Sequence, residues 1–300
     1  MALEQQGDSV SESMLSWLLD PAIRTFYGYW PSSLLIALIW AGFNWRKRSR
    51  HIKELFKTAY WLNSSCYQDY LLIIFNRSLF ALLGIGWFVM TIGISLQVLH
   101  FLQLFGNAAE PNSVASSWGI LFSYTVILFL LDDSSRFLLH KTMHKYDFLW
   151  RLHQLHHSAS QLTPLTSMRL HPLESLLYQL RATLIHGVGA GCSFYFLGFQ
   201  TDSFQIWGAT VWVIAFNALG ANLRHSHIKI DYGVFEKLLI SPAQHQAHHG
   251  VKSMNRNYGA ILSIWDRMAG TWRSGKKSYA LPQAAQSLSK QLLLQKIEWK

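Results

Sequence analysis

Histidines at short, repeated spacings are the residues of this 300-residue chain best suited to chemistry. Fourteen are present, and all but His51 and His100 fall between His140 and His249. Two are four residues apart, and the motif His-x-x-His-His occurs twice, so the set comprises His140, His144, His153, His156, His157, His245, His248 and His249. On a helix, residues three and four apart share a face, and imidazole binds zinc, copper, iron and nickel. Eight such ligands exceed the need of one ion, so the sequence predicts two metal ions.

The surroundings of these histidines narrow the chemistry. Zinc peptidases of the His-Glu-x-x-His type need a glutamate beside the first ligand, and Lys141 occupies that place. A metal transporter needs ligands near the middle of its membrane spans, whereas these histidines lie at expected helix ends and in polar segments. Solvated histidines that sense pH and haem held by His100 and His186 are further alternatives. The sequence favours a dinuclear redox centre, and a non-catalytic zinc-binding membrane protein or a metal transporter is the alternative function.

The composition indicates a membrane protein. Half of the residues are hydrophobic and 14% are charged, against about 25% charged in a typical soluble domain. The net charge of +10 comes from basic residues beside apolar runs, as in the run Arg46-Lys47-Arg48, which is typical of cytoplasmic flanks and does not favour nucleic-acid binding. The two cysteines, Cys66 and Cys192, are too few for a disulfide framework or a thiolate zinc site.

Apolar runs predict an all-α, polytopic membrane bundle. Residues 1–26 are expected to be a polar tail without a cleaved signal peptide. Apolar runs at 27–45, 78–105 and 118–131, and two helices within 176–222 broken at 197–202, make five apolar arms, or four if one arm dips only partway. Basic segments then place every histidine-rich stretch on the cytoplasmic face, in a helical cap that holds the dimetal site. The C-terminal tail, 273–300, is expected to include a helix from Leu281 that lies along the membrane or the protein surface.

The motifs between Asp133 and Trp272 resemble those of the fatty acid hydroxylase and sterol desaturase superfamily of integral membrane di-iron enzymes. The resemblance covers close to half of the chain and is specific in the order and spacing of its motifs. They include His140-x-x-x-His144, Trp150-Arg-Leu-His153-Gln-Leu-His156-His157-Ser158, Arg169-Leu-His171-Pro172-Leu-Glu174, Arg224-His225-Ser226-His227, Ser241-Pro242-Ala-Gln-His245-Gln-Ala-His248-His249-Gly250, Asn257-Tyr258-Gly259 and Trp265-Asp266. The resemblance implies a catalytic domain over residues 132–272, preceded by transmembrane helices over 27–131.

The resemblance also implies a ligand set. Nine histidines would hold two iron ions, with zinc as a possible substitute: His140, His144, His153, His156, His157, His225, His245, His248 and His249. Members often have a further ligand one helical turn before the residue matching His225, but that position is Ala221 here. His171, His227 or Asn222 would fill the gap, or one metal would keep an open site. Asp133 would orient an imidazole through its other ring nitrogen, or else be a helix-end carboxylate.

The implied activity is O2-dependent hydroxylation or desaturation of a lipid C–H bond. An unactivated C–H bond resists acids, bases and nucleophiles, so its oxidation calls for O2 and a reduced metal. The sequence has no Gly-x-Gly-x-x-Gly fingerprint and no appended cytochrome or iron–sulfur domain, so electrons are expected from a separate, acidic donor protein that docks on the histidine-bearing face. The resemblance allows sterols, fatty acyl chains, sphingolipids, carotenoids and ether lipids as substrates, and the sequence does not choose among them.

Overall fold

The computed structural model describes residues 19, 26–84, 86–110, 118–198, 204–276, 279–282 and 287–296. Helices are the regular secondary structure of this part of the chain, and one isolated antiparallel bridge joins Leu239 to Leu262. This confirms the predicted all-α class for the described residues. The predicted polar tail, 1–26, lies outside them apart from two residues.

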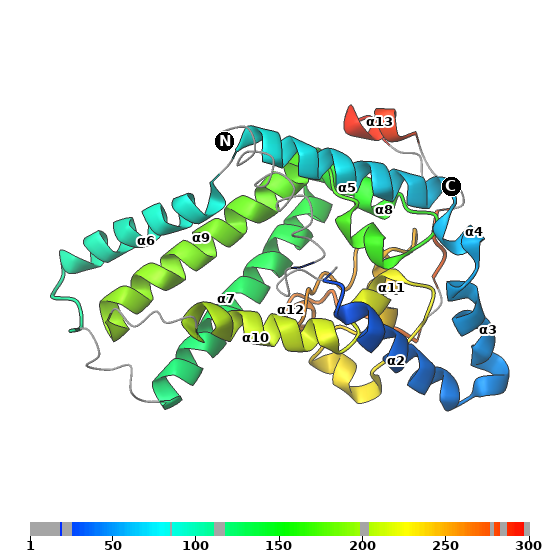
Figure 1. The fold of residues 1–300 in the computed structure, drawn as a ribbon, viewed down its shortest axis with the longest axis horizontal. Helices are drawn as coiled ribbons and strands as arrows, with labels where there is room; N and C mark the ends of the chain where they lie inside the picture. The colour runs from blue at the N-terminus through cyan, green and yellow to red at the C-terminus, as the bar shows by residue number, and fades with distance from the viewer. Residues whose placement is uncertain are drawn as a thin grey trace, which may run out of the picture. The chain divides into compact units, whose positions relative to one another are not determined.

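The chain forms two compact units, each built from separate stretches of sequence (Figure 1). The first unit comprises the chain up to Gly84, His140–Glu174 and the chain from Phe216 onward. It contains α2 (Tyr29–Gly42), α3 (Trp45–Leu55), α4 (Thr58–Trp61), α5 (Ser64–Leu83), α8 (Asp147–His157), η1 (Pro164–Met168), η2 (Ala221–His225), η3 (Gly233–Lys237), α11 (Pro242–His248), α12 (Ile264–Met268) and α13 (Leu288–Leu292). The second unit contains α6 (Trp87–Gln103), most of α7 (Trp118–Lys145), most of α9 (Pro172–Leu197) and most of α10 (Phe204–Ala218).

The apolar runs form helices that differ in length from the prediction. The predicted continuous run at 78–105 is interrupted, because α5 ends at Leu83 and Gly84 takes a left-handed conformation with φ of +56° before α6 begins. The run at 118–131 is only the first half of a 28-residue helix, α7. The two helices predicted within 176–222 correspond to α9 and α10, and residues 199–202 of the expected break lie outside the described residues.

A helix that crosses a bilayer needs about 20 mostly apolar residues. Over the described residues, no single helix is both long enough and apolar enough to cross a bilayer, whereas the bent pair α5 and α6 qualifies when taken together. Among the four or five predicted arms, this bent pair is the one that meets both criteria within the described residues. The expected surface helix of the C-terminal tail is the short α13, of five residues.

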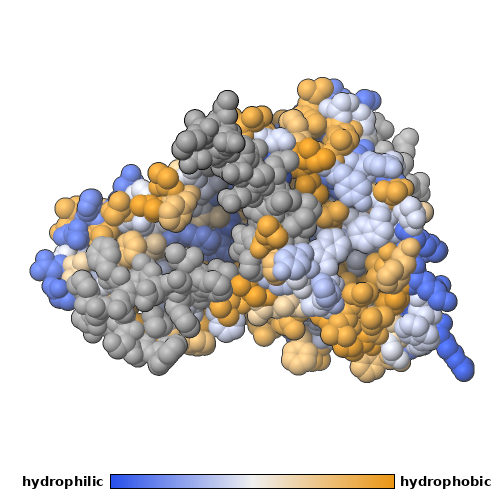
Figure 2. Space-filling view, in the orientation of Figure 1, coloured by the Kyte–Doolittle hydropathy of each residue, from blue (hydrophilic) through white to orange (hydrophobic). Residues whose placement is uncertain are grey.

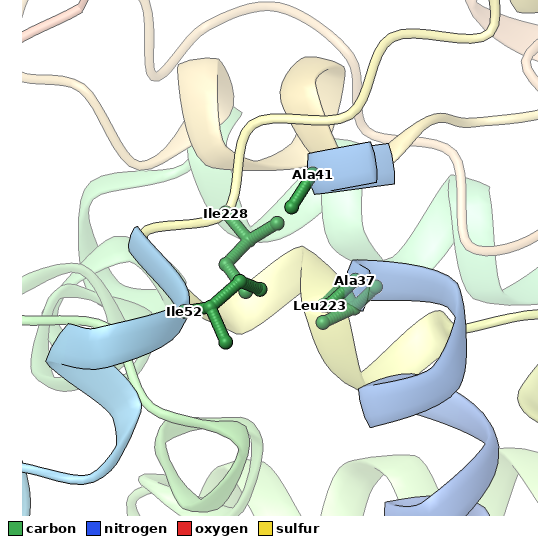
Figure 3. Packing of buried hydrophobic residues seen from close by; sticks show 5 residues of the cluster. All are labelled: Ala37, Ala41, Ile52, Leu223 and Ile228. Carbon is green, nitrogen blue, oxygen red and sulfur yellow. The ribbon is translucent and has the colours of Figure 1, made fainter. Parts of the chain in front are cut away.

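The hydrophobic core of the first unit fixes the segment that carries His225. Alanines on α2 and an isoleucine on the otherwise basic α3 bury their side chains against η2 and the chain that follows it (Figure 3). The residues of this cluster are Ala37, Ala41, Ile52, Leu223 and Ile228. Small alanine side chains allow a close approach, and the exclusion of water from the apolar groups stabilises it. His225, two residues after Leu223, is therefore positioned by the packing of α2 and α3.

A buried ion pair fastens the segment between α8 and α9 to α5. Arg169 donates from Nη1 to Asp69 Oδ1 at 3.0 Å, and neither side chain is exposed. Thr166 donates from Oγ1 to the other carboxylate oxygen of Asp69 at 2.8 Å, and Asn76 donates from Nδ2 to the carbonyl of Leu170 at 2.9 Å. Because buried polar groups need partners, these contacts determine one position for residues 164–170 against α5.

Close helix packing characterises the second unit. A Cβ added at Gly187 would lie 2.7 Å from Ile94 Cβ, and one at Gly191 would lie 2.6 Å from the Ser95 carbonyl oxygen, so both glycines let α9 approach α6. Small residues four apart are typical of close helix contacts inside membranes. Asp132 on α7 also accepts a hydrogen bond from Arg181 on α9 at 2.7 Å.

Candidate metal centre

The structure brings all nine predicted histidine ligands together in the first unit, as two groups. Within each group, one ligand atom from every residue lies within 4.8 Å of the others. Group A consists of His140, His144, His153, His157 and His248, and group B consists of His156, His225, His245 and His249. The groups are neighbours, since the rings of His157 and His249 stack with their centroids 4.8 Å apart.

Each His-x-x-His-His motif divides its histidines between the two groups. On α8, His153 and His157 belong to group A and His156 to group B. On α11 the division is reversed, because His248 joins group A while His245 and His249 join group B. Residues four apart on a helix project in nearly the same direction, whereas the residue between them points to one side. One helical turn can therefore serve two adjacent ions, and two facing helices supply six of the nine histidines.

The start of α11 is determined by its sequence. Pro242 stands at the first helical position, where its missing N–H removes no hydrogen bond. Ser241 caps the helix by accepting from the backbone N–H of Gln244, whose side chain in turn accepts from the N–H of Ser241. The buried carboxylate of Glu236 accepts from the hydroxyl of Ser241 at 2.6 Å. These bonds set where α11 begins, and so where its three histidines lie.

Backbone carbonyls orient two histidines of group A. His140 Nδ1 lies 2.8 Å from the carbonyl oxygen of Tyr258, and His248 Nδ1 lies 2.7 Å from that of Arg256. A carbonyl only accepts, so both Nδ1 atoms carry the proton, and in the neutral rings both Nε2 atoms carry lone pairs. These two Nε2 atoms are 3.0 Å apart. Two lone pairs that face each other repel, and a cation placed among them relieves the repulsion.

In group B, ring nitrogens of three histidines lie close to one atom, Nε2 of His225. His225 Nε2 lies 3.1 Å from Nε2 of His245, 3.1 Å from Nε2 of His249 and 3.3 Å from Nε2 of His156. Two imidazole nitrogens bound about 2.0–2.1 Å from a shared ion lie roughly 2.9–3.4 Å apart at octahedral to tetrahedral angles. The observed spacings therefore fit a metal ion held by these nitrogens.

Burial keeps the imidazoles in the neutral form that binds metals. Desolvation lowers the pKa of His140 and of His153 to about 3, with the neighbouring His153 as a second cause for His140. Desolvation, followed by neighbouring histidines, places the pKa of His157 well below its usual value. Both ring nitrogens of His157 and Nε2 of His153 are buried without a hydrogen-bond partner in the described part of the chain. Unpaired buried acceptors are costly, and a bound cation would satisfy them.

Glu174 is a site residue to which the sequence analysis assigned no role. Its Oε1 lies 2.6 Å from His153 Nδ1, and the carboxylate is fully buried at the start of α9. Burial raises the pKa of Glu174 and lowers that of His153, so the uncharged forms are favoured without a cation. A metal ion on Nε2 would favour the carboxylate, which then accepts from Nδ1–H. The sequence signal for Glu174 is a glutamate two residues after Pro172, at the start of an otherwise apolar helix.

We expect Glu174→Ala to lower metal affinity by about 10–100-fold, because His153, a predicted metal ligand, loses the partner that orients it. Glu174→Gln, which keeps an oxygen acceptor, should lose less. Metal retained per chain against a chelator series measures both effects. Asp231→Asn, at an exposed carboxylate, is the matched control. Unchanged metal retention in Glu174→Ala would contradict the assignment of Glu174 to His153.

The segment that orients His140 is itself held by Asp266. Its carboxylate accepts from the backbone N–H of Tyr258 at 2.9 Å, from that of Gly259 at 2.7 Å and from the Thr271 hydroxyl at 2.6 Å. A Cβ at Gly259 would lie 2.6 Å from the carbonyl oxygen of Leu262, so this position needs glycine. The motifs around Tyr258 and Asp266 therefore position the carbonyl that His140 needs.

The four additional candidates lie in different environments. His171 is outside both groups, and its ring nitrogens contact the Leu292 carbonyl and the Leu173 N–H. His227 is also outside both groups and donates from Nε2 to the His51 carbonyl at 2.8 Å. Asn222 is buried, and both polar atoms of its side chain lack a hydrogen-bond partner within the described ranges. Asp133 is buried on α7 in the second unit.

Comparisons with known proteins agree with this geometry. A sequence profile of the fatty acid hydroxylase family matches residues 125–271, which include all nine histidines of the two groups. The chain is 30% identical to alkylglycerol monooxygenase of Danio rerio over 61% of its length and 35% of that protein. It is 26% identical to the ornithine lipid hydroxylase OlsE of Rhizobium tropici over 52% of its length and 44% of that protein.

A further relative is the very-long-chain aldehyde decarbonylase GL1-9 of Oryza sativa subsp. indica, which is 29% identical over 59% of the chain and 65% of that protein. The chain thus spans between about one third and two thirds of the length of these relatives. No solved structure matches it.

Proposed function

The chain belongs to the fatty acid hydroxylase family, and on this premise we propose that it uses O2 to hydroxylate or desaturate a C–H bond of a lipid. The observation that carries the proposal is the convergence of nine histidines, eight of them buried and His144 half-buried, into two neighbouring groups. Two of the relatives are named as a monooxygenase of alkylglycerols and a hydroxylase of ornithine lipids, which supports oxygen insertion into a lipid.

The proposed ligands are the five histidines of group A for one ion and the four of group B for the other. Asn222 is proposed as a further ligand for group B. It precedes His225 by three residues on the short 3₁₀ helix η2, where side chains three apart are aligned. Its buried side-chain oxygen has no other partner within the described ranges. A pair of iron ions, when bound, supplies the redox chemistry with O2 that an unactivated C–H bond requires, and imidazole suits iron.

The protein's own groups prepare this site. Two backbone carbonyls hold the protons of His140 and His248 on Nδ1, so that both Nε2 lone pairs are free to bind an ion. Glu174 acts on group A through His153. Burial of the histidines excludes water from the imidazoles and keeps them neutral.

We propose that the enzyme is an integral membrane protein with the histidine groups on the cytoplasmic side. Large apolar side chains are exposed on several helices, and Figure 2 shows hydrophobic residues over much of the visible face. They include Leu35 and Ile39 on α2, Leu71 and Phe75 on α5, Phe88 and Phe101 on α6, Phe122 and Ile127 on α7, and Leu184 and Phe196 on α9. Exposed apolar surface of this extent is typical of contact with lipid. The basic helix α3 supports the cytoplasmic orientation, and a separate electron donor would dock on that side.

Lipid profiling of cells with and without the full chain tests the function. The expected result is a lipid that gains one oxygen or loses two hydrogens only in cells that make the protein, and not in cells that make His156→Ala or His248→Ala. Metal analysis of the purified protein should find iron. Purified protein that contains only zinc, changes no lipid and moves metal across vesicles would refute the proposal in favour of a transporter.

A further inference from the structure

A cavity of about 680 Å³ lies in the first unit beside the histidine groups, and the proposed chemistry does not use it. Its walls come from α3, α4, the chain after α8, the chain after η2 and residues 279–281. This volume is in the range of small-molecule sites, which are about 300–1,000 Å³. A concave site of this size suits a small ligand or a headgroup better than the broad surface of a partner protein.

Part of the cavity lining is cationic. Arg50, Lys53 and Lys57 line it, with Glu54 as the one carboxylate among its lining residues. Glu54 forms an ion pair with Lys57 at 2.6 Å. Arg50 and Lys53 have no ion-pair partner among the described residues, so two positive charges remain for a ligand. Arginine and lysine together are typical of phosphate recognition.

Other lining residues of the cavity are aromatic or apolar. Tyr60 is buried, donates from its hydroxyl to the Leu162 carbonyl at 2.9 Å and packs its ring against that of His227, 4.8 Å away. Leu162, Tyr279 and Leu281 also line the cavity. A site lined by both cations and apolar groups matches the junction between the phosphate of a lipid and its hydrocarbon chains.

The cavity shares its walls with the metal centre. Ser226 and His227 follow His225 directly, and Ser160 lies three residues after His157. Tyr279 donates from its hydroxyl to Gln246 Oε1 at 3.0 Å, and Gln246 follows His245 on α11. Consecutive Cα atoms are about 3.8 Å apart, so Ser226 lies close to His225 of group B and Ser160 lies within a few residues of His157 of group A. The Tyr279 hydrogen bond joins the cavity wall to the residue next to His245.

We propose that this cavity binds the phosphate-bearing headgroup of the lipid substrate, an inference that rests on the proposed lipid oxidation. Arg50 and Lys53 hold the phosphate, and the apolar lining residues contact the start of the hydrocarbon chain. The headgroup then acts as a fixed anchor, and its distance from the histidines selects which carbon of the chain is oxidised.

Binding by the full chain in a neutral detergent tests the proposal without any need for iron. The probes are dihexanoyl phosphatidate, dihexanoylglycerol, hexanoate and inorganic phosphate. Wild-type protein should bind the phosphatidate about 10-fold more tightly than dihexanoylglycerol or hexanoate, and more tightly than inorganic phosphate. Arg50→Gln/Lys53→Gln should lose this preference, and added salt should weaken it in the wild type.

The matched control is Arg46→Gln/Lys47→Gln, which removes the same charge from α3 at residues that do not line the cavity. It should keep the preference. Equal binding of dihexanoylglycerol or hexanoate would overturn the phosphate headgroup, and equal binding of inorganic phosphate would assign the cavity to a free anion. Suppose that Arg50→Gln/Lys53→Gln bound every probe normally but lost lipid oxidation only when a protein supplied the electrons. The two cations would then bind the electron-donor protein and not the lipid. Metal content and lipid oxidation, measured separately, report on the proposed function itself.

Discussion

Replacing His225 by alanine is expected to lower bound iron from about two ions per chain to about one and to reduce lipid oxidation to background. His225 Nε2 is the atom on which group B converges, at 3.1–3.3 Å from three other histidines. Loss of a hydrogen-bond partner of a metal ligand lowers metal affinity by ~10–100-fold. Loss of a proposed ligand itself should lower metal affinity by more. Group A keeps its five histidines, so one ion should remain.

Iron analysis and Mössbauer spectroscopy of the purified variant measure this outcome, because they separate a coupled pair of ions from a single ion. His100→Ala is the control, since His100 is exposed on α6 and belongs to neither group. It should keep both ions and full oxidation. A His225→Ala protein with two irons and normal turnover would refute the assignment of His225 as a ligand.

Removing Asp69 is expected to destabilise the fold by about 3–5 kcal/mol, because a buried guanidinium loses its counter-ion. The Arg169 side chain is unexposed and would retain only neutral acceptors, among them the Ser65 hydroxyl at 3.0 Å. Unfolding of Asp69→Ala in detergent should show this loss. Since the pair fastens residues 164–170 to α5, metal retention should fall together with stability.

The double variant Asp69→Leu/Arg169→Met tests whether the unpaired guanidinium of Arg169 causes the loss of stability. Apolar residues in place of a buried ion pair often restore stability, so the double variant should be more stable than Asp69→Ala. Asp147→Ala breaks an exposed pair with Arg151 and should cost much less. If Asp69→Ala were as stable as Asp147→Ala, the buried pair would have no role in fastening this segment.

The helix assignments show where sequence patterns are sufficient and where they are not. The apolar run at 118–131 correctly indicates a helix, but the pattern does not show that the helix continues through the polar residues to Lys145. The run at 78–105 reads as one span, whereas Gly84 in a left-handed conformation ends α5 within it. A hydropathy value averaged over many residues does not reveal such a helix end. The conformation of a single glycine depends on what packs around it.

The sequence by itself determined the all-α class, the family resemblance and the nine histidines that come together, because histidines at helical spacing are a local property of the chain. Only the tertiary structure decided how those histidines divide into five and four, which carbonyls orient His140 and His248, and that Glu174 contacts His153. The physical reason is separation along the chain. His140 and His248 are 108 residues apart, and no local spacing encodes a contact that the packing of several helices creates.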